Sequence, residues 1–289
     1  MATMRDIKRR RVSISSTQQI TKAMKLVSTV KLQKARTRAE NSKAYFNRMY
    51  ETVASILSSA GAIQHPYLQA RDTKKIGVVV VTSNRGLAGG YNSNITKLIT
   101  GSQWKKEELC IYAVGKKGAD SLASKGYQVV QNYSDIIEDP MYSDAQMISK
   151  QLLVDFAEGE IDEIYLAYTF FKNTVSHVPT LMKLLPVEQV EEAGEEVKDS
   201  VKDITPMNFE PSAEEAIDLL VPKYITSLLY GAFVEAVASE NGARMAAMDN
   251  ATNNADEMIN DLALKYNRAR QGAITQELTE IIAGAEAIN

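Results

Sequence analysis

Few residues in this chain belong to the types that usually carry out chemistry, and they lie far apart. The sequence holds two histidines, His65 and His177, and one cysteine, Cys110. Neither histidine has a second metal-ligating residue at a spacing typical of a metal site. Cys110 lies within an apolar run, which favours an inert buried thiol over a nucleophile. The residue types therefore predict no catalytic group, no metal and no cofactor.

The stretch that most resembles a binding site is glycine-rich. Residues 83–92 (SNRGLAGGYN) follow an apolar, β-branched run directly. Turns of this kind between a strand and a helix bind phosphate through exposed N–H groups and the positive end of the helix dipole. The glycine spacing, however, fits neither the dinucleotide fingerprint nor the P-loop, and no lysine is placed to reach a phosphate. We interpret the stretch as a connecting turn, and a nucleotide-binding α/β enzyme stays as an alternative.

Charge is distributed unevenly along the chain, although the net charge is only −3. Residues 1–38 contain eleven Lys and Arg against one acid, and residues 188–218 contain eleven acids against two lysines. Such asymmetry indicates a partner of opposite charge, or simply a solvated basic helix face. The basic segment lacks interleaved aromatic residues, so charge alone does not indicate nucleic acid. A basic coiled-coil module that binds nucleic acid or an anionic membrane is the second alternative.

Glycine and proline divide the chain into three segments that would position these residues. Residues 2–60 contain neither, and residues 212–289 contain one proline, Pro222, and few glycines. We predict an N-terminal helix over residues 1–60, an α/β domain over 61–211 and a C-terminal helix over 212–289. The acidic stretch at 188–203 is predicted to be a solvated loop of the α/β domain. Pro222 either kinks the second helix or lies near its start.

Both terminal segments carry residues at alternating steps of three and four, the period of a left-handed coiled coil. On the first helix the predicted seam is Ile20, Ala23, Val27 and Val30, followed by a second run at Phe46, Met49, Val53, Ile56 and Ala60. On the last it is Met248, Thr252, Ala255, Ile259, Leu262, Tyr266, Ala269 and Ala273. At about 1.5 Å per residue, the helices would be too long for a compact globule. The sequence predicts an antiparallel two-helix rod, against the alternative of a bundle of shorter helices.

The middle segment alternates short β-branched runs with helical patterns. Strands are predicted at residues 75–82, 109–115, 127–131 and 164–171, and helices at 93–99, 116–124 and 144–156. This alternation is typical of a doubly wound parallel sheet. The predicted fold class is α/β plus coiled coil: long antiparallel N- and C-terminal helices form a left-handed coiled coil, and a Rossmann-like α/β domain is inserted between them.

Four stretches, spread over the whole chain, resemble blocks of one known family in the same order. They are residues 6–35, 83–92, 238–255 (ASENGARMAAMDNATNNA) and 274–287 (ITQELTEIIAGAEA). The family is the gamma subunit of the rotary ATP synthase, in its bacterial form. Two residues depart from its pattern, because members commonly have an acid where Asn84 stands and often a cysteine where Ala88 stands.

The resemblance implies a non-catalytic central rotor shaft that transmits torque between the membrane c-ring and the catalytic beta subunits, and regulates them. The coiled coil would enter a hexamer of alternating alpha and beta subunits, with the apolar residues 281–288 turning in a hydrophobic sleeve. The α/β domain would lie on the c-ring beside the epsilon subunit. No cofactor and no nucleic acid are implied. The sequence shows no run of about 18 apolar residues, so a peripheral protein at the cytoplasmic face of the bacterial cell membrane is expected.

The resemblance also implies partner-contacting residues, position by position. Met24 and Lys25 match the positions that face an acidic lever of the beta subunit. Arg270, Gln271 and Thr275 match the positions that meet the catch loops of beta. The positions near the polar loops of the c-ring are matched by Phe209, Glu210 and Pro211.

Overall fold

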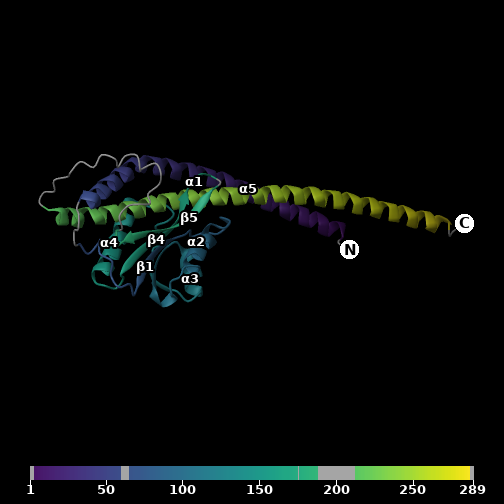
Figure 1. Cartoon of the computed structure of the whole chain (residues 1–289). Coiled ribbons are helices and arrows are strands. Elements are labelled where there is room, and N and C mark those ends of the chain that lie inside the picture. Colours follow the sequence, from purple (N-terminus) through teal and green to yellow (C-terminus); the bar gives the residue numbers. More distant parts are fainter. Residues whose placement is uncertain (1–2, 60–64, 175, 188–211, 287–289) are drawn as a thin grey trace. The chain divides into compact units, whose positions relative to one another are not determined.

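The computed structural model describes residues 3–59, 65–174, 176–187 and 212–286, which divide into two units. The coiled-coil unit consists of Met1–Thr29 and Arg244–Asn289, and the sheet unit is Val30–Ala243. Two helices, α1 (Met4–Ser59) and α5 (Ala213–Glu286), contribute to both units (Figure 1). Each terminal segment thus forms one uninterrupted helix, and the alternative of several shorter helices is wrong.

A five-stranded sheet forms the centre of the sheet unit, in the order β3-β2-β1-β4-β5. The strands are β1 (Ile76–Val81), β2 (Leu109–Val114), β3 (Gln128–Asn132), β4 (Glu163–Phe171) and β5 (His177–Leu185). The first four are parallel, which confirms the predicted strands, and β5 runs antiparallel to β4. β5 is not one of the four predicted strands, because its residues are mixed in polarity and it contains Pro179; the sequence indicates either a strand or a turn around His177 and Pro179. Proline has no N–H to donate to a neighbouring strand. It is therefore tolerated on an edge strand, which has a neighbour on one side only.

Burial explains why the middle segment folds as a doubly wound sheet. Every residue of β1 and β2 is buried, as expected for central parallel strands covered on both faces. One face packs against α2 (Tyr91–Thr100) and α3 (Lys116–Ser124), and the other against α4 (Tyr142–Ala157) and the first part of α5. A short 3-10 helix, η1 (Lys106–Glu108), precedes β2. The predicted fold class is confirmed.

Pro222 lies inside α5, and the helix continues through it. The hydroxyl of Thr226 donates to the carbonyl of Pro222 at 2.7 Å, one turn further on. A proline removes the N–H that would bond the carbonyl of Asp218, and Asp218 is exposed, so water can serve that carbonyl. The proline therefore lies near the start of a continuous helix, which is one of the two predicted outcomes.

The first part of α5 is apolar because it is a core element. By length and composition α5 passes the test for a membrane-crossing helix, the only helix to do so among the described residues. Half of the apolar stretch of α5 is buried inside the protein. Ile225, Leu229 and Phe233, near the start of α5, belong to the apolar core of the sheet unit. Its apolarity is thus accounted for by packing against the sheet.

Candidate partner-binding site

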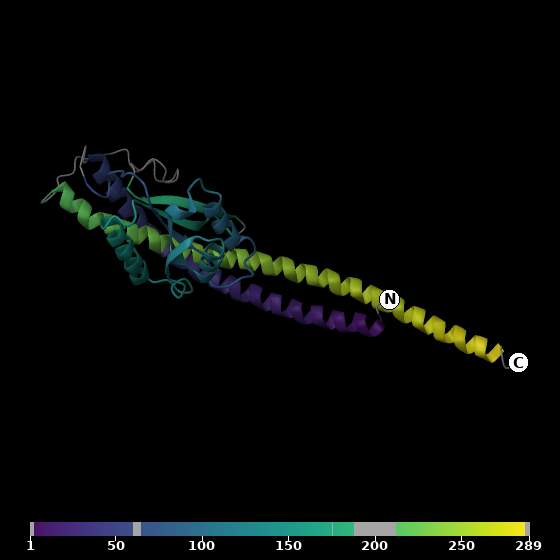
Figure 2. The same cartoon turned by 90° about the horizontal axis from the view of Figure 1, so that it is seen from below.

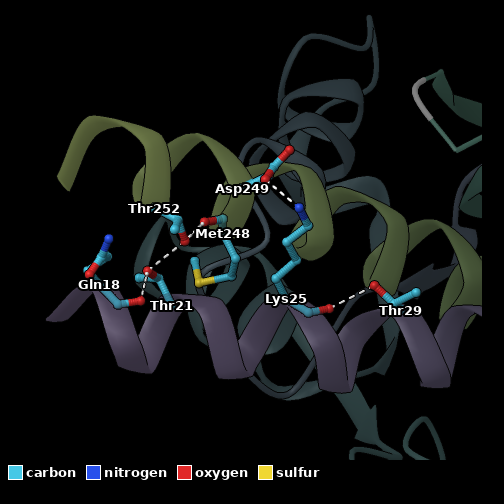
Figure 3. A network of polar contacts seen from close by, with 7 residues as sticks. All are labelled: Gln18, Thr21, Lys25, Thr29, Met248, Asp249 and Thr252. Carbon is cyan, nitrogen blue, oxygen red and sulfur yellow. Dashed lines mark hydrogen bonds and ion pairs between the residues drawn. The ribbon is translucent and has the colours of Figure 1, made fainter. Parts of the chain in front are cut away.

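The two helices of the coiled-coil unit are joined by polar contacts (Figure 3). The threonine hydroxyls of Thr21 and Thr252 lie 2.8 Å apart, and the ammonium of Lys25 donates to Asp249 at 2.6 Å. Among the described residues, the polar contacts that cross the coiled-coil unit include Gln18 with Asp256, Thr21 with Thr252, and Lys25 with Asp249. Residue numbers rise on one helix as they fall on the other, so the helices are antiparallel, as predicted.

This register determines where α1 stops covering α5. Gln18 bonds Asp256, so Met4, the first residue of α1, lies level with Arg270, the same number of residues further along α5. Residues 271–286 of α5 therefore continue beyond the first turn of α1 as a single helix, which we call the free end. Both views show α5 extending past the N-terminus (Figures 1 and 2).

The predicted seam is right on α5 and wrong on the N-terminal part of α1, whereas Val53, further along α1, is buried as predicted. Along α5, Met248, Ala255 and Leu262 are buried. On α1, however, Ile20 and Val27 are each 58% exposed, and the residues that follow them, Thr21 and Ser28, are 9% and 2% exposed. The steps of three and four recur on every face of a helix, so periodicity could not choose between these two neighbouring stripes. Apolarity pointed to the outward one.

Two exposed apolar surfaces result in the coiled-coil unit. On α1 an outer stripe, defined as Val12, Ile20, Leu26 and Val27, faces away from the seam. On the free end, the exposed apolar residues are Ile274, Leu278, Ile281 and Ile282. Large apolar side chains gathered on an exposed surface usually mark a contact with a partner. The sequence contained this signal in the apolar stripe of α1, which was assigned to the seam instead.

The structure places the predicted beta-contacting residues in two separate groups. Met24 and Lys25 are half-buried on α1, and Lys25 lies at the seam, where it donates to Asp249. Arg270, Gln271 and Thr275 are exposed where the free end begins, and the hydroxyl of Thr275 donates to the carbonyl of Gln271 at 2.9 Å. Lys25 is level with Asp249, so about 30 Å of helix separates the two groups.

The remaining predicted contacts fall outside the described residues. These are the foot positions, Phe209, Glu210 and Pro211, together with the acidic stretch at 188–203. The described residues thus contain the beta-contacting groups of the prediction but none of its c-ring positions.

The other candidate residues have structural partners. Asn84 joins two neighbouring segments, because its amide donates to the carbonyl of Ser134 at 2.7 Å and its oxygen accepts the N–H of Lys116 at 2.9 Å. Ser83 donates its N–H to Asn92 at 2.9 Å, which closes the turn. Burial raises the pKa of the Cys110 thiol, which disfavours a reactive thiolate. Within the described residues, no three His, Cys, Asp or Glu side chains gather as metal ligands.

Comparisons with known proteins agree over the whole chain. A family model described as ATP synthase matches residues 3–288. The ATP synthase gamma chain of Lachnoclostridium phytofermentans is 62% identical over 100% of both chains. The sodium ion specific ATP synthase gamma chain of Acetobacterium woodii is 41% identical over 99% of both.

Solved structures show the same fold. A chain of the central stalk and c-ring of the Tetrahymena thermophila mitochondrial ATP synthase has a TM-score of 0.60 at 25% identity, and the match covers 80% of this chain and 99% of that one. A chain of the Euglena gracilis mitochondrial ATP synthase has a TM-score of 0.73 at 19% identity, over 99% and 94% of the two chains. At that identity the second likeness supports the fold alone.

Proposed function

Since this chain belongs to the gamma-subunit family of the ATP synthase, we propose that it acts without catalysis of its own, as the shaft that transmits torque between the membrane c-ring and the catalytic beta subunits. Its coiled-coil unit enters a hexamer of alternating alpha and beta subunits. Its sheet unit lies on the c-ring beside the epsilon subunit, at the cytoplasmic face of the bacterial cell membrane.

The observation that carries this proposal is the free end of α5. A single helix of this length is marginally stable in water, since isolated helices depend on packing against other elements. The free end nevertheless exposes Ile274, Leu278, Ile281 and Ile282. An apolar sleeve formed by the hexamer would cover these side chains, and it would make few directional bonds that oppose rotation.

Torque transmission needs contacts that differ between three identical sites. A pair of helices has no threefold symmetry, so each beta subunit meets a different face of it. Switching one site from mostly open to mostly closed takes about 5.5 kcal/mol of differential interaction. Hydrogen bonds to charged groups contribute about 1.5–3 kcal/mol each. The cations of Arg270 and Lys25, supported by Gln271 and Thr275, are sufficient in number for that role.

The foot of the shaft is proposed from family resemblance. Phe209, Glu210 and Pro211 match positions near the polar loops of the ring, and the Tetrahymena chain is described as part of a central stalk and c-ring. The likeness of the sheet unit to such chains supports the same placement here.

Proton pumping per ATP tests the proposal. We expect Arg270→Ala to lower it severalfold in membrane vesicles, because a bond that forms only at certain rotary angles is lost. Met24→Lys should lower it as well, because a second cation beside Lys25 would prolong contact with an acidic lever. Assembly of both variants should be close to normal.

Arg36→Ala is the matched control. Arg36 is an exposed arginine of the sheet unit, paired with Glu40 on its own helix, and its loss should leave coupling unchanged. Normal coupling in both Arg270→Ala and Met24→Lys would contradict the proposed contacts.

A further inference from the structure

Lys25 is held by a carboxylate of its own chain. Its ammonium crosses the seam from α1 and donates to Asp249 of α5 at 2.6 Å (Figure 3). The side chains of Lys25 and Asp249 are 39% and 45% exposed, so both charges lie at the edge of the seam rather than inside it. An external group can therefore approach the ammonium without opening the helices.

Such a pair is easily exchanged. Ion pairs at this exposure are weak, since water screens both charges. A lysine ammonium has three donors, and an approaching carboxylate can share it or replace Asp249. The carboxylate of Asp249 would repel that newcomer while it competes for the same cation. The strength of any external contact of Lys25 thus depends on Asp249.

The other polar contacts of the seam lack this property. Asp256 accepts a hydrogen bond from the neutral amide of Gln18, and Thr21 meets the hydroxyl of Thr252. Removing the carboxylate of Asp256 would therefore release no cation. Among these three crossings, only the Lys25–Asp249 pair joins two formal charges.

We propose that Asp249 is a positioning residue that limits how strongly Lys25 binds a carboxylate of a partner subunit. Asp249 holds the ammonium across the seam between encounters and competes with the partner during each one. The inference rests on the proposed function, in which Lys25 faces an acidic lever of the beta subunit. The contact between Lys25 and the partner is therefore brief. A rotating shaft requires such brief contacts, because it must leave each of the three sites in turn.

The test is ATP hydrolysis by the assembled complex of alpha, beta and this chain, measured at low and high salt. Asp249→Asn keeps the shape and an acceptor oxygen but removes the charge. We expect its turnover at low salt to fall about twofold to fivefold, the scale of a weak ion pair. The deficit should shrink as salt rises, because screening weakens the longer-lived contact.

Two further variants show whether the effect acts through Lys25. In a Lys25→Gln background, Asp249→Asn should have no additional effect. Asp256→Asn is the matched control, since it removes a carboxylate from the same helix without freeing a cation, and turnover should not change. Thermal unfolding of each chain checks that the fold is retained.

The outcomes separate this inference from the proposed function. If Lys25→Gln alters turnover but Asp249→Asn does not, the role of Asp249 is wrong and the Lys25 contact stands. An equal loss from Asp249→Asn with and without Lys25 would make Asp249 merely structural, which also overturns the inference. If Lys25→Gln leaves turnover and its salt dependence unchanged, the proposed contact itself fails, and the inference fails with it.

Discussion

His177 and His65, the two histidines of the chain, both have structural roles. In β5, the ring of His177 packs so closely on α5 that a Cβ added at Gly242 would lie 2.7 Å from it. His65 accepts the N–H of Tyr67 at Nδ1, so its proton is on Nε2, which donates to Asp218 at 3.1 Å. That bond ties the segment after α1 to the first turns of α5. The sequence did not indicate what either histidine contacts, since both partners lie far away along the chain.

Burial makes His177 sensitive to acid. It lowers the pKa of His177, and the carbonyl of Thr174 opposes the shift only in part. In the unfolded chain, the imidazole of His177 binds a proton near pH 6.5. In the folded chain, the same imidazole binds a proton only at lower pH. The contribution of His177 to stability is therefore complete above about pH 6.5 and is lost as the pH falls below that value.

We expect the unfolding midpoint to fall between pH 7.5 and pH 5.5, and His177→Gln to make that fall smaller. Circular dichroism melts at the two pH values measure both chains. His177→Gln is expected to lower stability at both, so only the difference between pH values counts. An identical pH dependence in the two chains would show that His177 does not titrate as described.

At the scale of elements, the periodicity of a helix predicts its seam correctly only when the apolar face is also the face that packs against the partner helix. The seam of α5 was predicted correctly because its partner-facing residues, such as Met248 and Leu262, are also its apolar ones. On α1 the seam is formed by small and polar side chains, including Thr21 and Ser28, and the apolar stripe faces outward. Sequence alone cannot show which of two neighbouring stripes of α1 faces α5.

This arrangement makes a prediction about Ile20 and Val27. Replacing both with serine should change the free energy of unfolding of the isolated chain by no more than about 0.5 kcal/mol per site, the usual range for surface substitutions. Assembly with the alpha and beta subunits should weaken, because the outer stripe loses its apolar area.

Leu262→Ser is the contrasting variant. Leu262 is buried in the seam, and truncating a buried leucine costs about 2–5 kcal/mol. Chemical denaturation of the isolated chains measures both effects. A large destabilisation from Ile20→Ser with Val27→Ser would place those residues back in the seam.

At the scale of the whole molecule, fold class and family were readable from the sequence. Two uninterrupted helices and a parallel sheet each have strong local patterns, as in the wholly apolar β1. The candidate site could be predicted only in part from the sequence. Periodicity shows neither that Lys25 pairs with Asp249 nor that α1 leaves the free end uncovered. Both depend on the register between α1 and α5, which is seen in the polar contacts between them.

The free end permits a clean truncation. A chain that stops after Ala273 loses no α1–α5 contact described above, so its thermal unfolding should match that of the full chain. On the proposed function, the assembled complex should form in lower yield and hydrolyse ATP more slowly, because the free end would no longer be there for an apolar sleeve of the hexamer to cover. Size-exclusion chromatography and turnover measure the two effects, and an unaltered complex would show that the free end contributes nothing.

The polar seam has a mechanical consequence. Sliding α1 by one heptad toward the C-terminus of α5 would bring Lys25 opposite Asp256, but it would leave Thr21 against Ile259 and Gln18 against Ala263. Only one of the three bonds could re-form, whereas a uniform apolar seam would accept the new alignment at little cost. Sliding α1 along α5 would therefore break more polar bonds than it re-forms. The two helices resist a lengthwise load by keeping one register.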